Sequence, residues 1–255
     1  MELRSAALAA LGQETWQAKA DWLAQLNSQT ELDTQHALFA SSGIPGRPAI
    51  TLVPPARLGL RSVHTLEGRA LLIHALAHIE FNAINLALDV LWRFANMPSK
   101  FYYDWLSVAQ EECEHFRLLN QHLQTLGYQY GDFSGHDGLW EMAERTQDDV
   151  LARLALVPRT LEARGLDASP AVKHKLASGG DRAGAAIIDI ILRDEIGHVA
   201  IGNYWFRWLC VERKLDPITT YAELAQTYRA PKLKGPFNIE ARLAAGFEPT
   251  EIALL

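Results

Sequence analysis

The sequence predicts an all-α protein whose centre is a bundle of four long helices. Apolar residues recur at helical spacing through most of the 255 residues, and runs of alternating polar and apolar residues are nearly absent. Hydrophobic residues make up 49% of the chain, which is enough for a sizeable buried core. Segments rich in glycine and proline separate the helical stretches and mark where each should end.

The first half of the chain should contain an extra N-terminal helix and two bundle helices. The N-terminal helix is expected over about residues 5–27, and a proline-rich loop follows over 41–57. The first bundle helix should begin at residue 62 or 66 and end at 94, before Pro98. The second should run from Ser99 to 126, where Gly127 would terminate it.

The second half should supply the remaining two bundle helices after a crossover over residues 127–138. The third is expected over about 139–164, ending at Gly165. The fourth would start at about residue 171, with a break at the glycines 179–180, and continue to 214. These elements predict one domain in three parts: 1–60 packed on the bundle, 61–215 forming the bundle, and 216–255 as an ordered C-terminal tail.

A motif that occurs twice in the sequence supplies candidate metal ligands. Glu112 and His115 form one Glu-x-x-His sequence, and Glu195 and His198 form another. Residues three apart on a helix share a face, so the carboxylate and the imidazole of each pair can reach one metal ion. Both pairs fall on apolar stripes, where an unpaired carboxylate would be costly to bury.

Two further glutamates lie at core positions of the other two predicted helices. Glu80 lies on an otherwise apolar stripe, and Glu162 lies near the end of its helix. One glutamate from each of two helices and Glu-x-x-His from each of the other two form the ligand set of ferritin-like di-iron and di-manganese bundles. The predicted metal ligands are Glu80, Glu112, His115, Glu162, Glu195 and His198.

Other polar residues near these motifs have different expected roles. A metal-bound histidine usually donates its second N–H to a carboxylate, so we expect Asp194 to pair with His115 and Glu111 with His198. His74 and His78 have the spacing of a zinc-protease helix. The glutamate that would serve as general base there is replaced by Ala75, so they are expected to be core residues or to make hydrogen bonds between helices.

Several segments together resemble a bacterial ferritin-like family catalogued as domain of unknown function 455. They are HALAHIEF from His74, EECEHF from Glu111, PRTLEARGLD from Pro158, RDEIGH from Arg193 and GPFN from Gly235. The resemblance covers nearly the whole chain and implies a ferritin-like fold with a di-metal site. The RDEIGH segment is also similar to the second metal motif of ribonucleotide reductase small subunits and bacterial multicomponent monooxygenases, which supports the role expected for Asp194.

These features predict a non-haem oxidoreductase that holds two metal ions per chain and activates O2 or a peroxide. Four carboxylates balance two divalent cations; iron is expected, with manganese or a mixed Fe–Mn pair as alternatives. The substrate would be a small organic molecule or a tRNA nucleoside, and a monooxygenase would need an electron-transfer partner. A ferroxidase or peroxide-scavenging protein, and a non-catalytic metal-binding helical protein, remain as alternatives.

The bulk composition limits partners and location. The net charge of -6 argues against an extended nucleic-acid-binding surface. Two distant cysteines, Cys113 and Cys210, exclude a disulfide scaffold and a zinc ribbon. The longest apolar stretch, residues 71–92, is interrupted by polar residues, and the N-terminus lacks the features of a signal peptide. We therefore expect a cytoplasmic monomer or small homo-oligomer without a membrane span.

Overall fold

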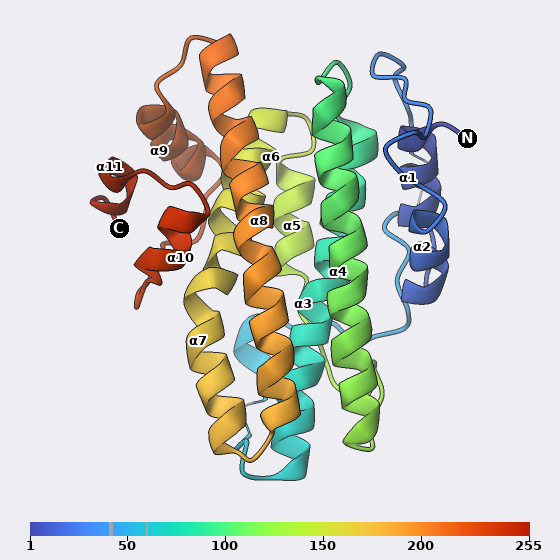
Figure 1. Cartoon of the computed structure of the whole chain (residues 1–255), viewed down its shortest axis with the longest axis vertical. Coiled ribbons are helices and arrows are strands. Elements are labelled where there is room, and N and C mark those ends of the chain that lie inside the picture. Colours follow the sequence, from blue (N-terminus) through green and yellow to red (C-terminus); the bar gives the residue numbers. More distant parts are fainter. Residues whose placement is uncertain (41–42, 60) are drawn as a thin grey trace.

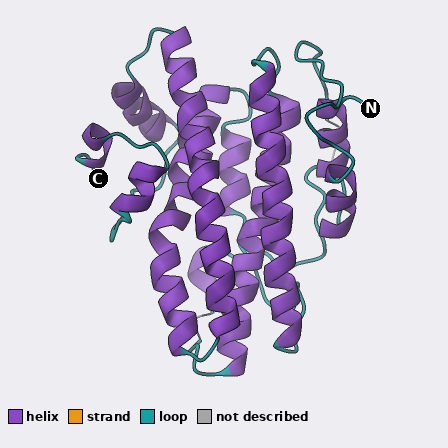
Figure 2. Cartoon of the chain, in the orientation of Figure 1, coloured by secondary structure: helices purple, strands orange, loops and turns teal. Residues whose placement is uncertain are grey.

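A computed structural model describes residues 1–40, 43–59 and 61–255, and its architecture is helical (Figure 2). Four long helices run side by side: α3 (Leu66–Arg93), α4 (Ser99–Thr125), α7 (Ala163–Ser178) and α8 (Arg182–Glu212) (Figure 1). Helix α3 packs on α4, α4 on α8, and α8 on α7. The described residues form no strand beyond an isolated bridge between Leu52 and Gly135. The all-α prediction is confirmed.

Helix α3 is buried along most of its length. The Thr65 hydroxyl accepts a hydrogen bond from the Gly68 N–H at 3.1 Å and caps its first turn. By length and composition this helix could cross a membrane, but 72% of its most apolar window is buried inside the protein, as in the core helix of a soluble protein. Its buried Asp89 accepts hydrogen bonds from Arg153 and from Arg93, which ties α3 to the helix that contains Arg153.

Helix α4 begins and ends near the positions expected from sequence, whereas α8 begins at Arg182 rather than at about residue 171 and ends at Glu212, close to the expected end. Helix α4 starts directly after Pro98, and Gly127 follows its end with a φ of 83°, the left-handed conformation that favours glycine. Asp181 caps α8 by accepting a hydrogen bond from the Gly184 N–H at 2.8 Å. Its other oxygen lies 2.9 Å from Nε2 of His122 on α4, so the same residue also joins these two helices.

The prediction of a single helix over residues 139–164 is wrong. The segment divides into α5 (Gly138–Arg145), α6 (Val150–Leu156) and the π-helix η2 (Val157–Glu162), and the chain then continues through Gly165 as α7 to Ser178. The polar residues 146–149 interrupt the helix, and Asp149 caps α6. Residues 171–178 therefore end this helix rather than begin the next, although the break at 179–180 is where we expected it.

The π-helix η2 begins beside Pro158, which has no N–H to donate to a regular helical turn. Gly202 of α8 lies against it: a Cβ atom at Gly202 would come within 2.6 Å of the Pro158 Cβ. The glycine thus permits close approach of α8 to the segment that ends at Glu162.

The ends of the chain cover opposite sides of the four long helices (Figure 1). The predicted N-terminal helix is two helices, α1 (Leu3–Leu11) and α2 (Trp16–Leu23), because the chain turns at residues 12–15 and the Thr15 side chain caps α2. The proline-rich loop contains the short η1 (Pro55–Arg57); residues 41 and 42, at its predicted start, lie outside the described residues. The predicted tail contains α9 (Pro217–Thr227), α10 (Ile239–Ala244) and α11 (Pro249–Ile252).

Candidate metal centre

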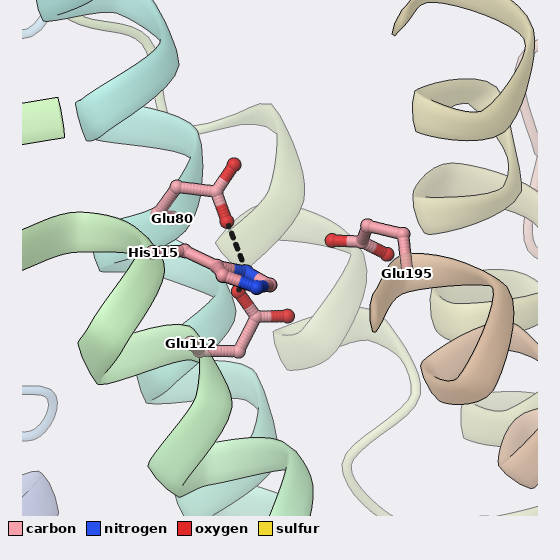
Figure 3. A group of neighbouring side chains, drawn as sticks. All are labelled: Glu80, Glu112, His115 and Glu195. Atoms are coloured by element: carbon pink, nitrogen blue, oxygen red, sulfur yellow. Dashed lines mark hydrogen bonds and ion pairs between the residues drawn. The ribbon is translucent and has the colours of Figure 1, made fainter. Parts of the chain in front are cut away.

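A cluster of buried acidic and imidazole side chains lies between the long helices. Glu80 comes from α3, Glu112 and His115 from α4, and Glu195 from α8. One possible ligand atom from each of these four residues lies within 4.8 Å of the others. Figure 3 shows Glu195 pointing across the gap towards the other three side chains. Such a buried cluster could bind metal ions.

His115 is held between carboxylates on both sides of its ring. Its Nδ1 atom lies 3.3 Å from a Glu112 oxygen and 3.5 Å from a Glu80 oxygen (Figure 3). Its Nε2 atom lies 3.2 Å from Oδ2 of Asp194 on α8. The Asp194 contact fixes the orientation of the ring so that Nδ1 faces the cluster.

His198 on α8 has a matching environment. Its Nδ1 atom lies 2.9 Å from Oε1 of Glu112 and 3.9 Å from an oxygen of Glu195. Its Nε2 atom lies 2.7 Å from Oε2 of Glu111 on α4. Each histidine therefore turns Nδ1 inward and is oriented by a carboxylate from the opposite Glu-x-x-His helix. Glu112 lies between the two rings.

Glu162 lies beside this group but outside the four residues that cluster most tightly. It is the last residue of η2, directly before α7. Its Oε2 atom is buried and, within the described ranges, has no hydrogen-bond partner. The same holds for an oxygen of Glu195. Buried polar atoms without partners are costly, and a bound cation would satisfy these carboxylate oxygens.

The carboxyl groups of the cluster differ in their affinity for protons. Burial, reinforced by the charge of Glu112, raises the pKa of Glu80 to about 7 and that of Glu162 to about 8. Burial and Glu112 raise the pKa of Glu195 in the same way. Burial also opposes ionisation of Glu112, but the positive charge of His198 and the N–H groups of both imidazoles outweigh it and hold the pKa of Glu112 well below its usual value.

The two imidazoles are correspondingly basic. Burial works against protonation of His115, but hydrogen bonds to Glu112 and Glu80 overcome it and raise its pKa to about 12. The pKa of His198 is also raised, since the charge of Glu112 and the hydrogen bond to Glu111 outweigh the effect of burial. Without a metal ion, protons supply the positive charge that the cluster needs. Metal ions and protons would therefore compete for the site.

A pocket of about 300 Å³ opens beside the cluster. Three of the carboxylates, Glu80, Glu162 and Glu195, contribute to its wall, and most of the remaining wall is apolar. The pocket lies between α3, η2, α7 and α8. The cluster is thus buried within the protein yet adjacent to a space that a small molecule could enter.

His74 and His78 are not part of the cluster. His78 lies 2.8 Å from the Tyr130 hydroxyl and 3.0 Å from the His136 carbonyl oxygen, and His74 accepts a hydrogen bond from the Gly131 N–H at 3.0 Å. Both side chains are buried, as expected of core residues, but their hydrogen bonds join the crossover loop to α3 and do not join two helices. The sequence did not predict the pocket beside the cluster. Its lining residues come from separate segments of the chain, and one of these segments is the π-helix η2, which was not predicted either.

Comparison with known proteins places the chain in a family. A family model described as protein of unknown function DUF455 matches residues 6–253. An uncharacterized protein of Haemophilus influenzae is 51% identical over 218 residues, which cover 83% of this chain and 75% of that protein. No solved structure matches the chain.

Proposed function

The chain belongs to the family described as protein of unknown function DUF455, and we propose that it is a di-iron carboxylate oxidoreductase that activates O2 or a peroxide. We infer this function from the buried cluster. The observation that carries this proposal is the position of Glu112 between two histidines whose outer nitrogens are held by Asp194 and Glu111. A carboxylate in that position can give one oxygen to each of two metal ions.

The other predicted metal ligands form two groups, one on each side of Glu112. Glu80 and His115 would hold one ion, and Glu162, Glu195 and His198 would hold the other. Four carboxylates neutralise two divalent cations, and mixed oxygen and nitrogen donors suit iron or manganese. The order of these ligands along neighbouring helices supports a ferritin-like bundle. When bound, the two metal ions would supply the redox chemistry that the side chains themselves lack.

The protein side chains would set the conditions for that chemistry. Asp194 and Glu111 keep the histidines oriented, while burial of Glu112 and His115, each 0% exposed, excludes bulk water. The adjacent apolar pocket favours oxidation of an organic molecule over iron storage, since it offers room for a substrate beside three of the ligands. In a monooxygenation the substrate would gain one oxygen atom and the other would leave as water, with two electrons and two protons supplied by an external reductant.

Anaerobic reconstitution with Fe(II), followed by exposure to O2, tests this proposal. We expect two iron ions per chain and, after oxidation, an absorbance spectrum characteristic of a coupled pair of Fe(III) ions that bleaches on reduction. Binding of metal without any spectral response to O2 would instead indicate a structural metal site. Protein that binds neither iron nor manganese would exclude the proposal.

A further inference from the structure

The pocket beside the cluster has two chemically different ends. At its inner end lie the carboxylates of Glu80, Glu162 and Glu195. Its walls are formed by aliphatic side chains from α3, the start of α5, η2, α7 and α8, among them Leu76, Ile79, Leu139, Leu161, Val172 and Ile188. Because these walls offer few hydrogen-bonding groups, the body of any ligand bound here should be apolar.

A positive side chain and an imidazole also line the same pocket. Arg164 of α7 lines it and is exposed, and in the described part of the chain its side chain makes no ion pair. Lys173, a cation of the same helix, already pairs with Asp189 at 2.6 Å. His136 also lines the pocket. Its Nδ1 accepts the Gly138 N–H at 3.2 Å, so in the neutral ring Nε2 bears the proton and can donate it to a ligand.

We propose that the pocket binds a small amphiphilic carboxylate, with its apolar chain against the metal cluster and its acid group at Arg164 and His136. A carboxylate can accept two hydrogen bonds from a guanidinium group, whereas the side chains of Glu80, Glu162 and Glu195 offer it no such donor when they are ionised. This inference rests on the proposed function, because it makes the apolar end of the ligand the part that would be oxidised.

The size of the pocket limits the length of such a ligand. Small-molecule sites usually enclose roughly 300–1,000 Å³, and the volume here, about 300 Å³, is at the lower end of that range. A short or medium aliphatic acid fits these dimensions and this polarity. A nucleoside does not match the apolar walls, since its sugar and base edges would lose hydrogen bonds to water without replacement.

Calorimetric titration with octanoate tests the inference, with octan-1-ol as an uncharged probe of the same length. The protein should be loaded with Mn(II), and its metal content measured on the same sample. We expect saturable octanoate binding that weakens about tenfold or more in Arg164→Gln, in line with loss of a charge-assisted hydrogen bond. Octan-1-ol should bind both proteins alike. Arg182→Gln, which removes an exposed cation at the start of α8, is the matched control and should bind octanoate normally.

A second variant tests the apolar wall. Ile79 is 42% exposed, so Ile79→Asp should fold and should weaken binding of both probes. Absence of saturable octanoate binding, or equal affinity in Arg164→Gln, would overturn the inference even if two Mn(II) ions are bound. Octanoate binding that depends on Arg164 in a protein holding no metal would support the pocket assignment while contradicting the proposed function.

Discussion

The Nδ1 atom of His198 on α8 lies 2.9 Å from Oε1 of Glu112 on α4. The other oxygen of Glu112 faces Nδ1 of His115 at 3.3 Å. This carboxylate therefore joins the two Glu-x-x-His helices at the middle of the cluster. If two metal ions bind, Glu112 is the residue that both would share.

Glu112→Gln should remove both metal ions. The amide keeps the size of the side chain but loses the negative charge and one acceptor oxygen, so neither half of the cluster retains its shared ligand. Metal analysis after reconstitution should show a fall from two ions per chain to near zero, with an unchanged circular dichroism spectrum. Glu114→Gln, on the exposed side of the same helix, should keep both ions. Full metal content in Glu112→Gln would show that this residue is not a shared ligand.

Asp194→Asn should weaken metal binding without abolishing it. Asp194 orients His115 through a contact of 3.2 Å, and loss of such an orienting carboxylate typically lowers metal affinity by roughly 10–100-fold. Competition with a chelator would measure the change. Asp189→Asn, which removes an exposed acid one and a half turns earlier on α8, is the control. An affinity equal to that of the unmodified protein would indicate that Asp194 does not support the ligand.

The metal-free protein should lose stability as the pH rises. Glu80 and Glu162 titrate at about 7 and about 8 in the folded protein, against an ordinary value of 4.5. Between these values the folded state holds more protons than the unfolded state, so the free energy of unfolding falls with rising pH. The raised pKa of His115 acts in the same direction above pH 6.5. The lowered pKa of Glu112 contributes fully above 4.5 and does not oppose this trend.

Urea denaturation of the metal-free protein at about pH 5.5 and about pH 8 measures this effect. The midpoint should be lower at the higher pH, and Glu80→Gln should reduce the difference because one of the titrating groups is gone. Loading with metal should also reduce it. A midpoint that rises with pH in the metal-free protein would contradict the assigned protonation of the cluster.

Asp89→Asn should be strongly destabilising. Asp89 and Arg153 are both 0% exposed, and removal of one buried charge leaves the other uncompensated, at a cost of roughly 3–5 kcal/mol. Chemical denaturation would measure the loss. Glu141→Gln, which breaks the exposed pair with Arg145, should change the free energy of unfolding by less than about 1 kcal/mol. Similar effects in both variants would show that burial of the Asp89 pair has little consequence.

The sequence was informative where local rules decide the structure. The terminator Gly127 lies at the helix end it was expected to mark, and the first bundle helix begins at Leu66, one of its two expected starts. The positions of Glu112, His115, Glu195 and His198 on apolar stripes predicted their burial, because helical spacing alone determines which residues share a face.

Other features depend on contacts between distant segments and could not be predicted in this way. Gly165 appeared to end a helix, but nothing in its surroundings requires a turn there, and α7 continues through it. Pro158 of the π-helix packs against Gly202 of α8, two residues far apart in the sequence. The pocket next to Glu162 is lined by residues from several separate segments, which helical spacing within one segment does not bring together.

Anomalous X-ray scattering at the iron edge, from crystals of the Fe-loaded protein, would locate the metal ions relative to Glu112. We expect two peaks, one on each side of the Glu112 carboxylate, with Glu80 and His115 near one and Glu162, Glu195 and His198 near the other. A single peak, or peaks located away from Glu112, would contradict this arrangement.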